Sequence, residues 1–392
     1  MKKSLLLLII GLVVFSCFMF AADEVKEAEV KLGGRIYQDW GWFSGDDEAI
    51  TAFGYDSGTE YRTARFSAEA LFWGHIKGKA EVDWTDGKVV FKDVYMELLD
   101  LPFNITVGHF KEPFSLEELT SSRFVTFMER ASINQAFVPS RNAGIQLSAN
   151  LADKMIYMAF GAFKEVGDYP TNLVANDGED LWAVTARIAA SPVYNEETNT
   201  VVHLGIAFSS RDLGDEGVAR LRARPETHMG NRLVDTHNIE AAMATLLGVE
   251  AAGVFGSFSL QGEYVSDSLD SPTNGDPVFS GYYVEASFWL TGENRKYKRS
   301  SAVFDRPKVK NLFLLQQGFG ALQLAARYSN LNLNDGDIEG GKMNDFTIGL
   351  NWYPVDNARI MLNYIISDTD NYGSINAFEI RFQYDWEAKF SK

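Results

Sequence analysis

The sequence predicts an all-β protein, a sixteen-stranded antiparallel transmembrane β-barrel with long connections folded into the lumen. Apolar and polar residues alternate through most of the chain, as they do in strands with two different faces. The alternating segments are about ten residues long. The connections between them are alternately short turns and long loops, as a membrane barrel requires. The last segment also has one face that is entirely apolar and mostly aromatic. Since only every second strand residue of such a barrel faces lipid, a hydrophobic content of 46% is sufficient.

The chain begins with a predicted export signal. Met1-Lys2-Lys3 precedes a short apolar run and then Ala21-Ala22, an arrangement typical of a secretory signal peptide. We therefore expect residues 1–22 to be removed and residues 23–392 to form the barrel domain. Cys17 is the one cysteine and ends a weaker lipoprotein-like pattern, so lipidation of Cys17 is the alternative. No later apolar run reaches the roughly 18 residues of a spanning helix.

Sixteen segments carry the period of two that predicts strands. In 61–72, for example, Ala64, Phe66 and Ala68 share one face, and Arg65 and Ser67 share the other. The predicted strands are 30–43, 61–72, 75–84, 89–98, 104–110, 143–151, 154–163, 181–191, 201–211, 238–252, 255–266, 279–291, 320–330, 342–353, 358–368 and 374–386. We expect a loop rich in Gly and Asp after the first strand, a tight turn at Gly253 and a short turn at 354–357.

The final strand distinguishes a membrane barrel from the alternative, a large secreted β-sandwich. One face of this strand is apolar or aromatic and the other is polar. The first face holds Phe378, Ile380, Phe382, Tyr384 and Trp386, and the second holds Glu379, Arg381, Gln383 and Asp385. Aromatic residues near a strand end suit the membrane interface, so the barrel is favoured.

One long stretch, 108–144, does not alternate. It lies between two predicted strands and carries Lys111, Arg123, Arg130 and Arg141 among Phe and Leu residues. A connection this long within a regular β-protein is usually functional or disordered, and its apolar residues indicate that it packs. We expect it to fold into the lumen and narrow the pore.

The overall charge excludes general nucleic-acid binding. The chain has a net charge of −17, and removal of residues 1–22, which hold two Lys and no acid, takes it to −19. A pore, however, responds to the local charge of its lumen rather than to the sum over the surface.

A row of arginines is the clearest local charge. Arg220, Arg222 and Arg224 alternate with apolar residues, so an extended backbone places them on one face about 6.5–7 Å apart. Guanidinium groups bind phosphate and carboxylate in a bidentate manner, so this arginine row could conduct anions. The alternative is an exposed segment facing water, or one whose charges pair with acids such as Asp93 and Glu97.

Further cations could extend an anion path. They are Arg62, Arg65, Lys77 and Lys79 on two early strands, and Arg295, Lys296, Lys298, Arg299, Arg306, Lys308 and Lys310 in the long connection 292–319. All three long connections are locally basic or mixed within an acidic chain, which favours an anion-handling lumen.

Catalytic patterns are poor. The five histidines lack metal-ligand spacing, no GxSxG motif occurs, and no pair of acids is distinguished as a general acid and base. We expect no catalytic residue, no metal, no cofactor and no enzyme activity.

Several longer motifs resemble a known family, the phosphate-selective porins O and P. They are FKDVYMEL, VGHFKEPFSLEELTSSRFVTFMERASINQAFVPSRNAG, RARPETH, LQGEY, LTGENRKY, FGALQLAARYS and GLNWYP, in the family's order and spanning about 34–386. The resemblance implies a homotrimeric outer-membrane barrel of a Gram-negative bacterium, in contact with lipid and lipopolysaccharide. It also implies that 111–142, 212–236 and 292–319 fold into the lumen.

The resemblance further implies roles for individual residues. Arg220, Arg222 and Arg224 match the family's arginine ladder, and Arg62 matches a second-strand arginine. Lys111 and Arg130 fall at the constriction loop. The chain departs from the family at Thr63, where a second consecutive arginine is frequent, and it has several lumen-facing acids, so the choice between phosphate and other anions stays open.

The expected function is passive diffusion of small anions, phosphate or polyphosphate among them, through a basic lumen. One alternative is a general or cation-preferring porin whose lumen acids outweigh the arginines. A barrel enzyme would need a histidine with an acid or serine partner at the rim, which the sequence does not indicate. A structural barrel that supports the envelope would have an occluded lumen.

Overall fold

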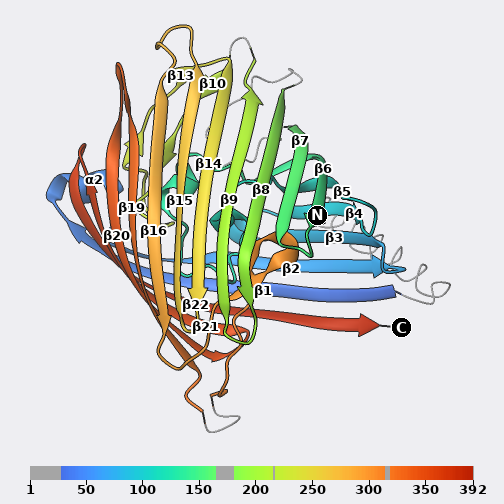
Figure 1. Ribbon diagram of the computed structural model, residues 1–392. Coiled ribbons are helices and arrows are strands. Elements are labelled where there is room, and N and C mark those ends of the chain that lie inside the picture. Colours follow the sequence, from blue (N-terminus) through green and yellow to red (C-terminus); the bar gives the residue numbers. More distant parts are fainter. Residues whose placement is uncertain (1–27, 165–180, 215–216, 314–317, 392) are drawn as a thin grey trace, which may run out of the picture.

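Sixteen antiparallel strands close into a barrel (Figure 1). The computed structural model describes residues 28–164, 181–214, 217–313 and 318–391, so the predicted signal peptide and Cys17 lie outside the described residues. The wall strands are β1 (Ala28–Gly45), β2 (Ser57–Phe72), β3 (Ile76–Asp83), β4 (Val90–Leu98), β5 (Asn104–Lys111), β6 (Arg141–Leu151), β7 (Ile156–Lys164), β8 (Trp182–Asn195), β9 (Thr200–Asp212), β14 (Met243–Phe255), β15 (Phe258–Asp270), β16 (Val278–Trp289), β19 (Ala321–Asp335), β20 (Ile338–Val355), β21 (Ala358–Thr369) and β22 (Gly373–Ser391).

The first and last strands seal the barrel. Each strand pairs with its neighbours in chain order, and β1 pairs with β22 over a register from Val30↔Phe390 to Gly45↔Ile375. Figure 1 shows these two strands side by side. The predicted barrel is therefore confirmed, and the β-sandwich is excluded.

The strands are apolar outside and polar inside. On β22, Phe382 and Tyr384 are 47% and 50% exposed, whereas Arg381 and Asp385 are 2% and 1% exposed. A soluble protein has the opposite distribution, and this pattern is the one that lipid outside and a polar interior require. Within the described residues, no helix is long and apolar enough to cross a membrane.

Connections alternate between the two ends because neighbouring strands are antiparallel. The turn end, where both β1 begins and β22 finishes, carries the short connections 73–75, 99–103, 152–155, 196–199, 256–257 and 356–357. It also carries one long connection, 290–320, which we call the turn-side insertion. The loop end carries 112–140, the inner loop, and 213–242, the arginine loop.

Small elements shape these connections. The first loop contains α2 (Asp47–Phe53), and β3 is followed by η1 (Thr85–Gly87). The inner loop contains α3 (Leu116–Leu119) and α4 (Ser132–Ala136). The arginine loop contains β10 (Val218–Ala219), which pairs with β13 (Ile239–Glu240), and β11 (Arg222–Ala223), which pairs with β12 (Val234–Asp235). The turn-side insertion contains β17 (Lys296–Lys298), η2 (Arg299–Ser301) and β18 (Val303–Asp305).

One detail of the sequence prediction was wrong, and another needs an addition. Gly253 is not a turn but lies within β14 opposite Leu260, and the turn falls at residues 256–257, where Gly256 has a φ of 62°. The predicted loop after β1 is present and also contains the short helix α2. The Phe53 side chain of α2 is fully buried against the arginine loop and the wall, and this tertiary contact stabilises a helix that local sequence does not announce.

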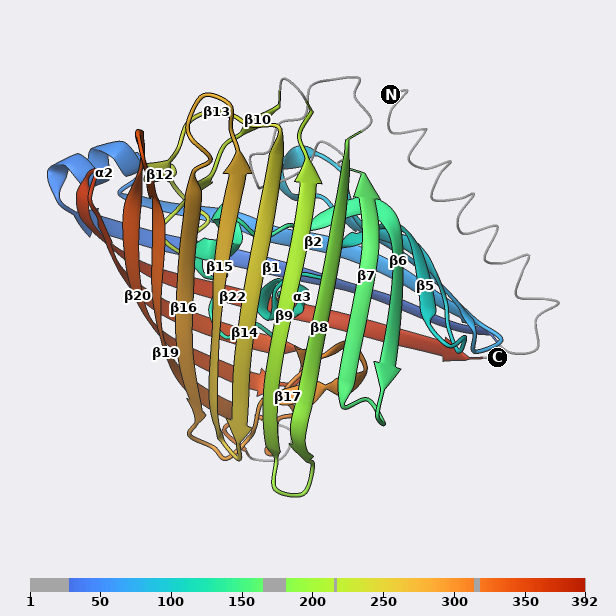
Figure 2. The same cartoon turned by 45° about the horizontal axis from the view of Figure 1, so that its top comes forward.

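The inner loop lies within the ring of strands (Figure 2). Its carbonyl oxygens accept hydrogen bonds from inward-facing strand side chains, such as Arg359 to Val125 at 2.7 Å and Asn351 to Thr126 at 2.8 Å. On one side, Ile133 and Ala136 pack in a cluster with residues of the arginine loop. On the other side, Leu116 packs with Tyr297, Ala302 and Phe304 of the turn-side insertion. The inner loop therefore contacts both of the other long connections.

Candidate functional site

Two cavities lie between the inner loop and the part of the barrel wall that contains the first strands, β1 to β3. Their volumes are about 410 Å³ and about 340 Å³. The first, nearer the loop end, is lined by Arg62, Lys111, Arg130 and Arg141, and the second, nearer the turn end, by Lys31, Lys77 and Glu387. Both are lined by the same six residues, which we call the junction: Arg35, Arg65, Lys79, Glu81, Arg123 and Lys298. A solute crossing from one cavity to the other would pass these six side chains.

The lining is basic although the chain is acidic. Among the described residues, ten Lys or Arg and four Asp or Glu line the first cavity, and seven Lys or Arg and four Asp or Glu line the second. At the junction itself Glu81 is the single acid among five cations. The chain as a whole has a net charge of −17. The excess of basic over acidic residues in the cavity lining is thus opposite in sign to the net charge of the chain.

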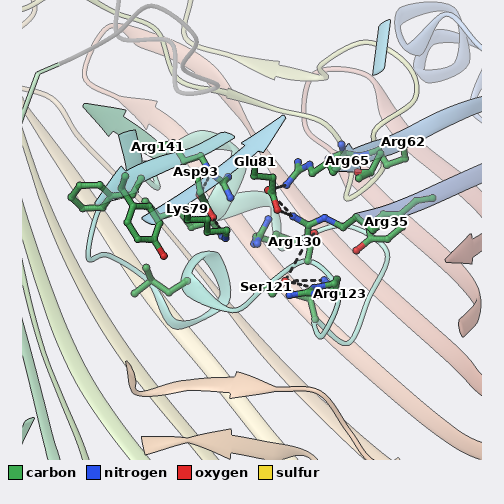
Figure 3. Close-up of a pocket in the computed structure, with 18 of the residues that line it drawn as sticks. Arg35, Arg62, Arg65, Lys79, Glu81, Asp93, Ser121, Arg123, Arg130 and Arg141 are labelled. Carbon is green, nitrogen blue, oxygen red and sulfur yellow. Dashed lines mark hydrogen bonds and ion pairs between the residues drawn. The ribbon is translucent and has the colours of Figure 1, made fainter. Parts of the chain in front are cut away.

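Arginines of the first two strands build one side of the junction (Figure 3). Arg35 on β1 donates from Nη2 to both oxygens of Glu81, at 2.8 and 2.9 Å, and its Nη1 reaches the hydroxyls of Ser121 and Ser122 at 3.3 and 3.4 Å. Arg65 on β2 donates to Asp83 at 2.6 Å and to Glu81 at 3.2 Å. The carboxylates hold the two guanidinium groups in place, and the serine hydroxyls add neutral donors and acceptors.

Carboxylates also fix the neighbouring cations of the first cavity. Asp93 is shared by Lys79 at 2.6 Å and by Arg141 at 2.5 Å. Glu118 of the inner loop is shared by Lys111 at 3.0 Å and by Arg130 at 3.1 Å. Burial would raise the pKa of Glu118, but the cations of Arg130 and Lys111 outweigh burial and lower it to about 2. Arg130 also donates to backbone carbonyls of residues 117, 118 and 120, so it orders the inner loop.

Two junction cations are less neutralised. Arg123 of the inner loop has its nearest carboxylate oxygen, on Asp385, at 3.7 Å, and its Nε contacts Ser121 at 3.4 Å. Burial and the nearby Arg35 both lower the pKa of Arg123. Lys298 is exposed on β17, and its side chain makes no hydrogen bond or ion pair with any residue that the structure describes. Both side chains line the two cavities.

The arginine row lines neither cavity. Its apolar partners Ala219, Leu221 and Ala223 are buried against the barrel wall, which leaves the arginines on the opposite face as the alternation predicts. Arg220 pairs with Asp235 at 2.8 Å, Arg222 lies opposite Asp235 in the β11–β12 register, and Arg224 donates to the carbonyl of Gly230 at 2.7 Å.

Arg232, which sequence reasoning did not select, completes this patch. Burial and then the charges of Arg224 and Arg222 lower its pKa to about 10. The four arginines therefore form a basic patch on the arginine loop rather than part of the cavity wall.

Arg62 connects this patch to the first cavity. Arg62 lines the cavity, donates to Glu129 at 2.8 and 2.9 Å, and lies close enough to Arg224 for the two charges to interact. Glu129 also binds Arg381 of β22, at 2.7 Å. Lys77 lines the second cavity only and pairs loosely with Glu97 at 3.5 Å and Glu69 at 3.7 Å.

Comparison with known proteins identifies the chain. Residues 30–386 match the model of a family described as phosphate-selective porin O and P. The chain belongs to this porin family. Porin O of Pseudomonas aeruginosa is 28% identical to it over 412 residues, which cover 93% of this chain and 90% of that protein. An uncharacterized protein of Caulobacter vibrioides is 30% identical over 346 residues, 86% of this chain and 68% of that protein.

Solved structures agree with the fold of the porin. An anion-selective porin from Comamonas acidovorans superposes with a TM-score of 0.57 at 11% identity, covering 92% of this chain and all of that one. The trimer form of OmpT from Vibrio cholerae gives a TM-score of 0.58 at 12% identity, covering 92% of this chain and 99% of that one. At these identities they show the barrel fold alone. With the family match, the porin is a channel of a Gram-negative outer membrane and not an enzyme.

The structure adds cavity-lining residues to those selected from the porin's sequence. Arg62, Arg65, Lys77, Lys111, Arg123 and Arg130 all line a cavity. Lys79, Arg141 and Lys298, which sequence reasoning named among the basic residues, line a cavity as well, and the cations that it did not select are Lys31, Arg35 and Arg381. Arg35 and Arg381 occupy the polar phase of their strands, so alternation was a signal that could have selected them. Of the basic residues in the turn-side insertion, Lys298 alone lines either of the two cavities, and nothing in the local pattern distinguishes it from Lys296.

Proposed function

We propose that this porin is a passive channel for small anions, with phosphate-type anions as its preferred solutes. The observation that carries the proposal is the excess of Lys and Arg over Asp and Glu in both cavities of a chain whose net charge is −17. The description of the family as phosphate-selective supports the choice of anion.

The mechanism is electrostatic. An anion that enters the first cavity meets Arg35, Arg65, Arg123 and Lys298 at the junction, together with the hydroxyls of Ser121 and Ser122. These donors replace part of its hydration shell, and guanidinium groups match the geometry of phosphate oxygens. Because Glu81 and Asp83 already hold Arg35 and Arg65, each contact with a passing anion is weak enough to be released.

A cation-preferring pore is the second candidate, because Glu81, Asp93, Glu97 and Glu129 also line the first cavity. Zero-current potential across a planar bilayer under a KCl gradient separates the two. We expect a potential that favours chloride, and a chloride current that falls when phosphate is added. A potential that favours potassium would overturn the proposal.

A matched pair of variants tests the site. Lys296 and Lys298 are both exposed on β17, but only Lys298 lines the cavities. Lys298→Gln should lower the ratio of chloride to potassium permeability, and Lys296→Gln should leave it close to the wild-type value. Equal effects of the two substitutions would mean that the junction does not set the selectivity.

We also propose a homotrimer. The two shortest wall strands, β3 and β5, have eight residues each and flank β4, which has nine, as does β7. A strand needs about 9–11 residues to cross the hydrocarbon core, so this part of the wall is short for lipid and suited to contact with another copy. On the remaining outer surface, we predict contact with lipid and lipopolysaccharide. The signal peptide at residues 1–22 also stays a prediction.

A further inference from the structure

Two arginines share one buried carboxylate beside the junction. Asp385 on β22 is 1% exposed and accepts from Arg306 of the turn-side insertion, through Nη2 to Oδ1 and through Nη1 to Oδ2 at 3.3 Å. Arg123 of the inner loop comes no closer than 3.7 Å to the same carboxylate. Arg306 therefore holds Asp385 in a two-point contact, whereas Arg123 lies beyond hydrogen-bonding distance.

An aromatic ring keeps the two arginines in this arrangement. The guanidinium carbons of Arg123 and Arg306 each lie 5.0 Å from the centre of the Phe124 ring. Arg306 is fixed further by a hydrogen bond from Nη1 to the carbonyl of Asp356 at 2.7 Å, and the backbone carbonyl of Arg123 accepts from Gln383 at 3.1 Å. The inner loop and the turn-side insertion thus meet at one acid and one ring.

The two arginines are equally exposed, with side chains 29% accessible, but they differ in which cavities they line. Arg123 lines both cavities and belongs to the junction, whereas Arg306 lines neither. A buried carboxylate needs a cationic partner, because an unpaired buried charge strongly destabilises the folded state. If Arg306 were absent, Arg123 would be the nearest replacement.

We propose that Arg306 is a positioning residue for selectivity: by occupying Asp385, it keeps the guanidinium group of Arg123 directed at the cavities and available to anions. The inference rests on the proposed anion channel and names a residue outside the two cavities that positions the least neutralised arginine of the junction. The charge of Arg306 also opposes the approach of Arg123 to Asp385, since like charges at short range repel.

The test is a double-mutant cycle read as the ratio of chloride to potassium permeability in planar bilayers. The variants are Arg306→Gln, Arg123→Gln and the two combined, with Arg306→Lys as the conservative replacement. Lys310→Gln is the matched control, because Lys310 is an exposed cation of the same insertion that lines neither cavity and contacts neither Asp385 nor Arg123.

We expect Arg306→Gln to lower the permeability ratio about as much as Arg123→Gln, and the combined variant to be no lower than either one. Arg306→Lys should restore most of the ratio, and Lys310→Gln should not change it. Arg306→Gln could still lower the permeability ratio when Arg123 is already Gln. The charge of Arg306 would then act on the permeating ions directly and not through Arg123, and the inference would be overturned.

Two further measurements separate a loss of selectivity from a loss of folding, and a failure of the Arg306 role from a failure of the proposed anion channel. Each variant should keep the heat-resistant mobility of a folded barrel on a denaturing gel, so that a lost ratio is not a lost fold. A wild-type channel that prefers potassium would refute the proposed function itself. A wild-type channel that prefers chloride, with an unchanged ratio in Arg306→Gln, would refute only the role of Arg306.

Discussion

At the scale of single residues, the pore is built from cations that differ in how far they are neutralised. Arg35 and Arg65 are held by Glu81 and Asp83, whereas Arg123 and Lys298 have no carboxylate within 3.5 Å among the described residues. The paired arginines contribute a rigid set of donors, and the less paired cations contribute charge. Selectivity should therefore depend more on the second group than on the number of basic residues.

The arginine row should act at a distance. Arg222 lines neither cavity, so we expect Arg222→Ala to lower the chloride current at low salt, where its field reaches incoming anions, and to have little effect in about 1 M KCl, where the Debye length is about 3 Å. Single-channel conductance at several KCl concentrations measures this. A reduction that is equal at all concentrations would place Arg222 at the constriction instead, and unchanged conductance at low salt would remove any role for it.

Alternation in the sequence placed Arg65 and Lys77 on the inner face of the wall, because strand periodicity decides which face a residue takes, whereas Arg62 is out of phase with Arg65 and reaches the cavity through a register shift between residues 61 and 63 of β2. Alternation could not supply their partners. Glu129 binds both Arg62 and Arg381, which are 67 and 252 residues away, and these contacts exist only after the inner loop has folded into a closed barrel. For the same reason the choice of Lys298 over Lys296 required the structure.

At the scale of elements, the inner loop depends on its own ion pairs. The folded pKa of Glu118 is about 2, below its ordinary value of 4.5, so its stabilising effect is complete above about pH 4.5 and is lost as the pH falls towards 2. Glu118→Gln should lower the free energy of unfolding by roughly 1–3 kcal/mol at neutral pH, since hydrogen bonds to charged groups contribute about this much.

Urea unfolding of the wild type and Glu118→Gln at a series of pH values measures this effect. The difference between the two should narrow as the pH falls below about 4.5. Glu48→Gln on the exposed start of α2 serves as the control and should match the wild type throughout. A difference that stays constant down to pH 2 would mean that the charge of Glu118 does not hold the loop.

The positions of the wall strands were predictable and those of the small elements were not. Strand periods are repeated over many residues, so a local error such as the turn at Gly253 leaves the count of strands unchanged. By contrast, β10 to β13 are two residues long, and α3 and α4 are four and five. Elements this short carry no periodic signal and are fixed by their tertiary contacts.

At the scale of the whole molecule, the short wall strands β3 to β5 lead us to predict that three copies of the porin associate through this part of the wall. Chemical cross-linking or native mass spectrometry of the detergent-extracted porin should give three copies. Replacing outward-facing Met96 and Val107, which are 53% and 47% exposed, with Lys should convert the trimer to monomers that still fold. A trimer that survives both substitutions would place the interface on another part of the wall.

The pairing of β1 with β22 has a consequence for biogenesis. The first strand made receives one of its two neighbours only when the last strand arrives, and the partners Val30 and Phe390 stand at opposite ends of the chain. Until that moment the nascent sheet has two open edges, which hydrocarbon cannot hydrogen-bond. The sheet must therefore be completed where water or another protein can hydrogen-bond its two edge strands. Strand-by-strand insertion into the membrane would require a protein that covers both edges.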